Sequence, residues 1–463
     1  MAALTPNSSF SLTLQLKIPN QAGMLANITQ AIAAAGGNLG DVGLISRNRK
    51  TVVRTVNVDA SSEEHAETIV EAVANLQEIE ILDICDRTFT LHEGGKISVE
   101  SKLPLTNQED LAMAYTPGVG RICLEIARHP ERVYDLTIKG NTIAIVTDGS
   151  AVLGLGNLGP AGAMPVMEGK ALLFKKFAGL DAFPVCLDTQ DTDEIVATVK
   201  RIAPVYGGVN LEDISAPRCF EIEARLREEL DIPVFHDDQH GTAIVTLAAL
   251  INALKLVNKP IDTVTVVING AGAAGVAIAN LLGKAGVAQI LMCDSRGILS
   301  TKRDDLNRQK QSFAVDKSGS LADAMVGADV FLGVSVPGVV TVDMVQSMAS
   351  GPIIFAMANP IPEIQPELIR DIVAVMATGR SDYPNQINNV LAFPGVLRGA
   401  IDCRAHALTA SMYLEAAYAI ASLVNSDELD KEHIIPSVFD ERVAPAVAAA
   451  VKHAARVDGV ASE

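Results

Sequence analysis

Val264-Thr-Val-Val-Ile-Asn-Gly-Ala-Gly-Ala-Ala-Gly275 is the stretch that decides the fold of this chain. Its apolar first half predicts a buried strand, and the apolar run 276–285 predicts a helix directly after the glycines. The next predicted strand, 289–293, ends on Asp294, about 20 residues past the last glycine. A glycine-rich turn in this setting is typical of a Rossmann-type dinucleotide-binding domain, whereas a plain tight turn lacks the acid at the next strand tip. The predicted cofactor contacts are Gly270, Gly272, Ala273, Ala274, Gly275 and Asp294.

Two acidic pairs follow apolar runs upstream of this domain. Asp237-Asp238 comes after the predicted strand 232–235, and Glu212-Asp213 comes after the strand-like run 202–209. Neighbouring carboxylates at a buried strand end repel each other unless a cation holds them ionised or one takes up a proton. Mg²⁺ and Mn²⁺ favour carboxylate oxygens, so the pairs predict a divalent metal site.

The region around these pairs alternates strands and helices. Strands are predicted at 141–147, 183–187 and 232–235, and later at 330–334, 353–356 and 373–377; helices are predicted at 163–177, 191–202, 216–230 and 243–257. This alternation predicts parallel sheets with right-handed crossovers. The chain is alanine-rich and helical from residue 400 to 424, and again from 437 with an interruption at Pro445.

The first 91 residues form a separate pattern. Strands are predicted at 10–18, 39–47, 51–58 and 79–91, and helices at 24–35 and 62–76, which is the βαββαβ order of a ferredoxin-like unit. With Asn20-Gln-Ala-Gly-Met-Leu25 at the first turn, this unit resembles an ACT domain. The resemblance implies paired domains and a small regulatory effector near Asn20, Gly23, Met24 and Leu25; the alternative is that Gly23 only shapes a turn.

Composition limits the classes of partner. The 463 residues carry 37 basic and 55 acidic side chains, a formal charge of −18, which argues against nucleic acid or an anionic membrane. The six cysteines are scattered without a CxxC pair, and the N-terminus has no signal-peptide pattern, so we expect a cytoplasmic protein with reduced thiols. The run 243–257 is too short to span a membrane.

A dinucleotide domain beside a metal suits hydride transfer from an alcohol, which needs a general base and a general acid. Lys170 lies in an apolar, glycine-flanked stretch near the predicted metal, where we expect its pKa to be lowered. Tyr115 precedes a Thr-Pro-Gly turn that would fix its phenol. The alternatives are a solvated lysine and a tyrosine that only packs.

Several motifs together resemble the short prokaryotic malic enzymes. They are Tyr-Thr-Pro-Gly-Val (115–119), Thr-Asp-Gly-Ser-Ala-Val-Leu-Gly-Leu-Gly-Asn (147–157), Met-Pro-Val-Met-Glu-Gly-Lys (164–170), Asn-Leu-Glu-Asp-Ile (210–214), Phe-His-Asp-Asp-Gln-His-Gly-Thr (235–242), Gly-Ala-Gly-Ala-Ala-Gly (270–275), Ala-Asn-Pro (358–360) and Asn-Asn-Val-Leu-Ala-Phe-Pro-Gly (388–395). The resemblance implies oxidative decarboxylation of L-malate to pyruvate and CO₂, with NAD or NADP and Mn²⁺ or Mg²⁺. It also implies a homodimer or higher homo-oligomer.

The resemblance assigns roles to individual residues. Lys170 would be the base on the malate hydroxyl, Tyr115 the acid that protonates enolpyruvate, and Asp237 a neighbour that tunes Lys170. The implied metal ligands are Glu212, Asp213 and Asp238; the implied contacts to substrate and nicotinamide are Asn359 and Asn389.

Two points about specificity stay open in the sequence. Larger relatives have an arginine where this chain has Ala151, so Ser150 and nearby amides are the candidates to bind malate's carboxylate. Asp294 favours NAD because a carboxylate repels a 2′-phosphate, while Arg296 leaves NADP open.

The predicted fold is therefore α/β in four parts. Residues 1–91 form an ACT-like regulatory domain, 96–235 a parallel-sheet substrate and metal domain, 236–400 a Rossmann-type domain, and 401–463 C-terminal helices.

Three other interpretations compete with this one. The first is a zinc site built on His236 and His240, which are spaced as in HExxH. The second is an effector-binding protein with an inactive enzyme portion. The third is another metal-assisted NAD(P)-dependent hydroxy-acid dehydrogenase or decarboxylase, acting on oxaloacetate or a related acid, or a phosphotransferase-type relative.

Overall fold

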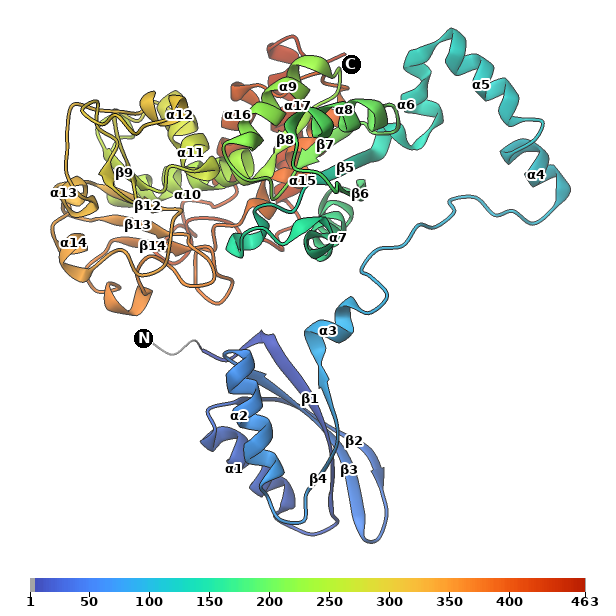
Figure 1. Ribbon diagram of the computed structural model, residues 1–463, viewed down its shortest axis with the longest axis vertical. Helices are drawn as coiled ribbons and strands as arrows, with labels where there is room; N and C mark the ends of the chain where they lie inside the picture. Colours follow the sequence, from blue (N-terminus) through green and yellow to red (C-terminus); the bar gives the residue numbers. More distant parts are fainter. Residues whose placement is uncertain (1–4, 463) are drawn as a thin grey trace. The chain divides into compact units, whose positions relative to one another are not determined.

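The computed structural model describes residues 5–462, and the chain divides into two compact units, Met1–Ser98 and Val99–Glu463 (Figure 1). The first unit contains β1 (Asn7–Pro19), α1 (Met24–Ala34), β2 (Asn38–Arg47), β3 (Thr51–Ala60), α2 (Glu63–Ala74), β4 (Glu80–Asp86) and α3 (Arg87–His92). Its four strands form an antiparallel sheet in the order β2-β3-β1-β4. This is the predicted ferredoxin-like arrangement.

Alternation along β1 builds the core of the first unit. Leu12, Leu14, Leu16 and Ile18 point inward and are buried, because successive side chains of a strand face opposite sides of the sheet. They pack against the apolar faces of α1 and α2.

The predicted last strand, 79–91, is too long. β4 ends at Asp86, whose side chain accepts hydrogen bonds from the amides of Thr88 and Phe89 and so begins α3. An N-cap aspartate at this position starts a helix where the apolar pattern alone favoured a longer strand.

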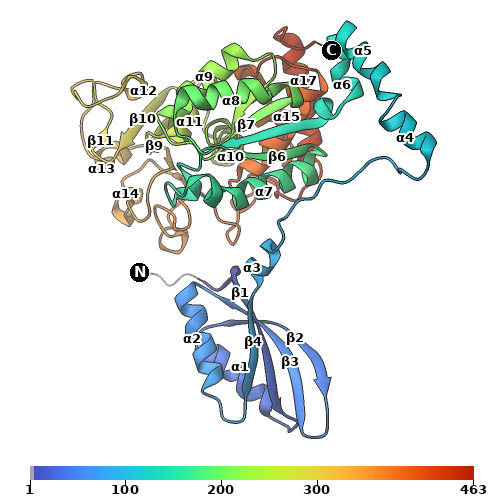
Figure 2. The same cartoon turned by 45° about the vertical axis from the view of Figure 1, so that its right-hand side comes forward.

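The middle sheet of the second unit is parallel throughout. Its order is β6-β5-β7-β8. The elements are η2 (Ile138–Asn141), β5 (Thr142–Thr147), η3 (Val152–Gly154), α7 (Gly159–Ala178), β6 (Asp181–Cys186), α8 (Thr192–Ile202), η4 (Ala203–Val205), β7 (Gly208–Leu211), α9 (Arg218–Glu229) and β8 (Val234–His236). Helices α8 and α9 cover one face, and α7 packs against β5 and β6 (Figure 2). The run 202–209 is not one strand, because Pro204 lies in the turn η4 and leaves only 208–211 for β7.

The Rossmann-type sheet has the order β11-β10-β9-β12-β13-β14, and only β11 is antiparallel. Its elements are β9 (Thr265–Asn269), α11 (Ala273–Lys284), β10 (Gln289–Asp294), β11 (Gly297–Ile298), α12 (Arg308–Gln311), α13 (Leu321–Met325), β12 (Val330–Gly333), α14 (Val342–Gln346), β13 (Ile353–Ala356), η6 (Pro366–Leu368) and β14 (Val375–Thr378). The predicted strands and the helix after the glycines are confirmed.

The two sheets are joined by η5 (Asp237–Gly241), a single π-helical turn, and α10 (Thr242–Val257). Together these residues are long and apolar enough to cross a membrane, but most of this stretch is buried inside the protein. The core helix of a soluble protein can have the same length and composition. After the Rossmann-type sheet come η7 (Asn389–Leu391), α15 (Phe393–Asp402), α16 (Ala410–Ser422) and α17 (Val443–Val457), with α16 packed on α10 and α15 on α7.

Residues 99–136, here called the arm, begin the second unit. They contain α4 (Gln108–Ala114), α5 (Val119–Arg128), η1 (Pro130–Arg132) and α6 (Val133–Leu136), none of which has a buried residue. The arm exposes a series of large apolar side chains: Val99, Leu103, Leu105, Leu111, Met113, Tyr115, Ile122 and Leu124. Such a surface is expected to have a partner.

Candidate active site

Two of the three glycines after β9 are required sterically. A Cβ on Gly270 would lie 2.4 Å from the Val334 carbonyl oxygen, and one on Gly275 would lie 1.8 Å from the Gly270 oxygen. The N-cap of α11, Gly272, faces open space, so a phosphate can approach the free amides of Ala273 and Ala274. The turn therefore has the shape that a pyrophosphate requires.

Asp294 lies at the tip of β10 as predicted, but its carboxylate is already occupied. Arg303 pairs with both oxygens at 2.8 and 3.0 Å, and Lys310 lies 2.8 Å from Oδ2. Although burial opposes it, these hydrogen bonds lower the pKa of Asp294. A neutralised Asp294 repels a 2′-phosphate less strongly than the sequence suggested.

Three carboxylates meet between the ends of β7 and β8. Glu212, Asp213 and Asp238 place ligand oxygens within 4.8 Å of one another. The amide of Asp213 donates to Asp238 Oδ2 at 2.9 Å, and the backbone of Asp213 is left-handed, at φ 54°. Aspartate adopts this left-handed conformation more readily than most residues. The conformation lets the consecutive carboxylates of Glu212 and Asp213 join the same group.

The chemistry of this cluster suits a divalent cation. Burial, the largest cause, and the neighbouring carboxylates raise the pKa of Asp213 to about 8; they also raise the pKa of Glu212 to about 7, although Lys170 opposes this. Among the described residues, the buried Oδ2 of Asp213 has no hydrogen-bond partner. Three oxygen donors with an unsatisfied lone pair fit Mn²⁺ or Mg²⁺.

Lys170 projects from α7 into the same cluster and is buried. Its Nζ lies 2.5 Å from Asp237 Oδ2, 3.0 Å from Glu212 Oε1 and 4.2 Å from the centre of the Phe393 ring. Burial alone would lower the pKa of Lys170, but the two carboxylates outweigh it and the pKa is raised. The expectation of a lowered pKa is therefore wrong for the chain by itself, because the sequence did not show how close both carboxylates lie.

The predicted substrate residues differ in availability. Asn389 donates a hydrogen bond to Asp237 Oδ2 and so belongs to the Lys170 cluster. Asn359 is exposed. Its side-chain amide lies beside Gly379, and its backbone carbonyl faces Gly154, which follows β5 of the middle sheet.

Ser150, by contrast, has no free hydrogen-bonding capacity. Its hydroxyl donates to Asp148 at 2.6 Å and accepts from the Ser215 amide at 2.9 Å and from Arg218 at 3.0 Å. The nearby amides of Gly149, Ser150 and Ala151 also donate within the protein. Arg218, which the sequence did not single out, is the cation beside this loop, paired with Asp148 at 2.8 Å.

Tyr115 does not join the cluster within the chain. It caps the end of α4 in the arm and is 67% exposed. Figures 1 and 2 both show α4 away from α7, which carries Lys170.

The two histidines of the zinc interpretation have different surroundings. His236 is fully buried and neither ring nitrogen has a hydrogen-bond partner among the described residues, although Nδ1 lies 4.0 Å from Asp238 Oδ2, whereas His240 lies 2.6 Å from Glu223. Burial lowers the pKa of His236 to about 4. Neither histidine belongs to the carboxylate group that could hold a metal, so the structure does not support a zinc site.

The predicted effector residues lie at the first βα turn. Gly23 has φ 90° and open space around it, at the N-cap of α1. Asn20 donates to the Asn48 carbonyl at 2.7 Å, and Met24 is part of the core. Leu25 is half-buried.

Comparison with known families and proteins agrees with this geometry. Residues 94–227 match the family "Malic enzyme, N-terminal domain", 239–456 match "Malic enzyme, NAD binding domain", and 6–82 match "ACT domain".

Similar proteins span most of the chain. An NAD-dependent malic enzyme from Geobacillus stearothermophilus is 53% identical, covering 99% of this chain and 97% of that protein. An NADP-dependent malic enzyme from Escherichia coli is 47% identical, covering 80% of this chain and 51% of that longer protein. The crystal structure of a malic enzyme from Pyrococcus horikoshii is 46% identical, with a TM-score of 0.79 over 81% of this chain and 92% of that one. The chain belongs to the malic enzyme family, the malate dehydrogenases that decarboxylate their substrate.

Proposed function

We propose that this chain converts L-malate to pyruvate and CO₂ in a metal-dependent reaction, with Glu212, Asp213 and Asp238 as the ligands of Mn²⁺ or Mg²⁺. One observation carries the proposal: Glu212 belongs both to the three-carboxylate group and to the ion pairs of Lys170, at 3.0 Å. The candidate base and the candidate metal site therefore share one side chain. A substrate chelated there would have its hydroxyl beside Lys170.

The side chains of the cluster can take up and hold the substrate proton. Lys170 Nζ and Asp237 Oδ2 are 2.5 Å apart, and burial raises the pKa of Asp237 to about 6. Asp237 and Glu212 hold Lys170 protonated, so the amine must lose a proton before it can accept the hydroxyl proton of malate. A cation on Glu212 would offset the charge of that carboxylate and so favour the neutral amine, with Asp237 as the nearest proton acceptor. Asn389 holds Asp237 in place. A bound dication would polarise the substrate oxygen and stabilise negative charge as CO₂ leaves.

The experiment that tests the function is an absorbance assay for reduced nicotinamide, with malate, Mn²⁺ and NAD or NADP. We expect reduction only when malate and the metal are both present, with pyruvate formed in equal amount. Reduction that persists in excess EDTA, or that yields oxaloacetate without pyruvate, would contradict the proposal.

Mn²⁺ affinity is expected to rise with pH. Because the pKa values of Glu212 and Asp213 are raised to about 7 and about 8, protons compete with the ion strongly at pH 6 and only weakly at pH 9. The Mn²⁺ dissociation constant should fall about ten-fold or more between these limits. Electron paramagnetic resonance of free Mn²⁺ measures this directly, and a constant affinity across the range would show that the carboxylates are already ionised.

We propose that NAD is the preferred cofactor, because Asp294 lies at the tip of β10 where it can accept from a ribose 2′-hydroxyl. We propose that NADP is also used, because Arg303 and Lys310 neutralise Asp294 and so reduce its repulsion of a 2′-phosphate. Replacing Arg303 with glutamine removes a cation from the ribose site and frees an acceptor for the 2′-hydroxyl. The ratio of kcat/KM for NADP to that for NAD should fall about ten-fold. Lys176→Gln, on α7, should leave the ratio unchanged. An unchanged ratio in Arg303→Gln would mean that Asp294 does not meet the ribose.

We also propose that the arm docks on a second copy of the chain and that Tyr115 acts there as the proton donor to enolpyruvate. The support is the exposed apolar surface of the arm together with the absence of Tyr115 from its own chain's cluster. A symmetric dimer would bury both arms and complete two sites.

Regulation by a small effector at residues 6–82 is proposed from the ACT family match and from the open turn at Gly23. Titrating amino acids and organic acids into the assay tests it, with Gly23→Val as the variant expected to lose the response. We also propose domain boundaries at 235/236 and 400/401.

A further inference from the structure

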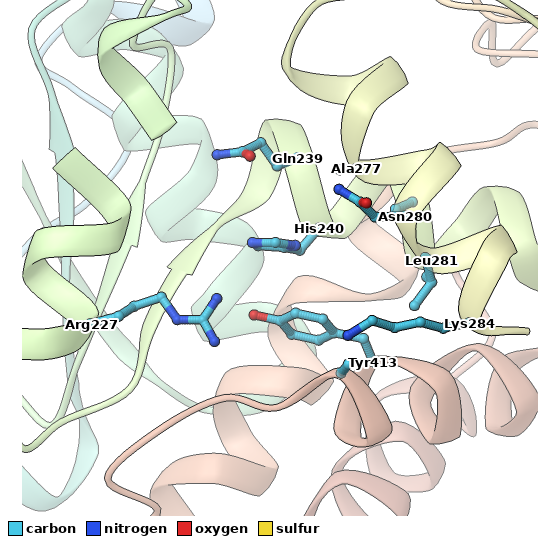
Figure 3. Close-up of a pocket in the computed structure, with 10 residues that line it drawn as sticks. Arg227, Gln239, His240, Ala277, Asn280, Leu281, Lys284 and Tyr413 are labelled. Carbon is cyan, nitrogen blue, oxygen red and sulfur yellow. The ribbon is translucent and has the colours of Figure 1, made fainter. Parts of the chain in front are cut away.

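A cavity is lined in part by Gln239 and His240 of η5, the residues that follow Asp238 of the carboxylate cluster. It has a volume of about 380 Å³ and is lined by residues of α9, η5, α10, α11 and α16 (Figure 3). This is within the size range of small-molecule sites, at its lower end. None of the residues described as lining it is acidic.

Two cations face this cavity. Arg227 of α9 projects toward its centre in Figure 3, and Lys284 of α11 also lines it. Lys284 has no ion pair with any residue in the described part of the chain. In a protein with a net charge of −18, a cavity lined by cations and no acid favours an anion.

The nearest acid, Glu223, is already occupied. Its Oε1 lies 2.6 Å from His240 Nε2 and 3.3 Å from Arg227, and its Oε2 accepts from Gln239 Nε2 at 2.9 Å. Arg227 donates its other hydrogen bond to the Leu408 carbonyl and keeps further N–H groups. Glu223 therefore fixes the wall of the cavity and leaves the anion site open.

Tyr413 supplies an independent sign of a ligand. The residue is 5% exposed, its ring stacks on His240 at 4.6 Å between centroids, and its hydroxyl is buried without a partner among the described residues. Figure 3 shows that hydroxyl pointing toward the Arg227 guanidinium. Buried hydroxyls without a partner are uncommon, and an acceptor oxygen next to Arg227 would satisfy this one.

We propose that this cavity binds a small organic carboxylate, held by Arg227, Lys284 and the hydroxyl of Tyr413. A planar guanidinium pairs with a carboxylate through two parallel hydrogen bonds, and Lys284 can neutralise a second charge on a short dicarboxylate. The site is distinct from the proposed malate site because none of its lining residues belongs to the Lys170 cluster or to the carboxylate group.

Occupancy of this site should alter metal binding. The turn η5 carries Asp238 toward the carboxylate cluster and Gln239 and His240 toward the cavity. A ligand that immobilises His240 would also immobilise Asp238, and the coupling would act equally in both directions. This second step rests on the proposed role of Asp238 as a metal ligand.

Calorimetric titration of succinate into the full-length protein in EDTA tests the site itself. Without a metal, the carboxylate cluster repels a dianion, so binding reports the cavity. We expect one saturable site, about ten-fold weaker in Lys284→Gln and in Tyr413→Phe, and unchanged in Lys176→Gln. No saturable binding, or equal affinity in all four proteins, would overturn the proposal.

Mn²⁺ binding with and without saturating succinate tests the coupling. We expect Mn²⁺ to bind about five-fold more tightly in the presence of succinate in the wild type, and no change in Lys284→Gln. Succinate binding without an effect on Mn²⁺ would overturn the coupling alone. Failure of Mn²⁺ to bind at all would refute the proposed metal role while leaving the calorimetric result intact.

Discussion

Replacing Lys170 with alanine is expected to lower kcat for pyruvate formation by about 10³–10⁴-fold. The amine is the only basic side chain within hydrogen-bond distance of both Asp237 and Glu212 in the described residues, so no other group there can take its place. Loss of the buried cation should also destabilise the fold by about 3–5 kcal/mol, because two buried carboxylates lose their partner. Kinetics with malate, Mn²⁺ and NAD measure the first effect, and thermal unfolding the second.

Chemical rescue separates catalysis from folding in this variant. A small primary amine such as methylamine should restore part of the activity of Lys170→Ala, since it can occupy the vacated space beside Phe393. NAD binding should be unchanged because the turn Gly270–Gly275 follows a strand of the other sheet. Near-normal kcat in Lys170→Ala would assign the base to another residue.

Mixing two inactive variants is expected to regenerate activity. Tyr115→Phe should lose the protonation of enolpyruvate more than hydride transfer, and Lys170→Ala should lose the whole reaction. If the arm crosses to a second copy, a mixed dimer has one site with both Tyr115 and Lys170. Equal mixing after dissociation makes half of the dimers mixed, so about a quarter of wild-type activity should return.

The control for this experiment is a mixture in which both subunits lack Lys170, which should stay inactive. Leu111→Asp or Met113→Asp, on the exposed apolar side of the arm, should weaken the dimer measured by ultracentrifugation. Recovery of no activity in well-mixed dimers would show that Tyr115 serves the site of its own chain or none.

The sequence predicted the parts of the molecule that local patterns determine. The alternation along 10–18 predicted a half-buried strand, and the glycines at 270–275 predicted the dinucleotide-binding turn. Both patterns depend only on neighbouring residues. The two acidic pairs were recognised for the same reason, and the structure brings Glu212 and Asp238 into one group.

Features that depend on distant residues were missed. The raised pKa of Lys170 depends on carboxylates 42 and 67 positions away, at 212 and 237. Ser150 is tied to Arg218, 68 residues on, and Asp294 is neutralised by cations from the loop and helix that follow it. No periodicity reports such pairs, since they form only when the sheet brings strand ends together.

Mn²⁺ binding to the purified protein, followed by electron paramagnetic resonance at pH 8, tests the central claim most directly. The account predicts one ion per chain, bound at least about ten-fold more weakly in Glu212→Gln and in Asp238→Asn. The exposed carboxylate variant Asp427→Asn should bind as the wild type does. Equal affinity in all four proteins would place the metal elsewhere and contradict the account.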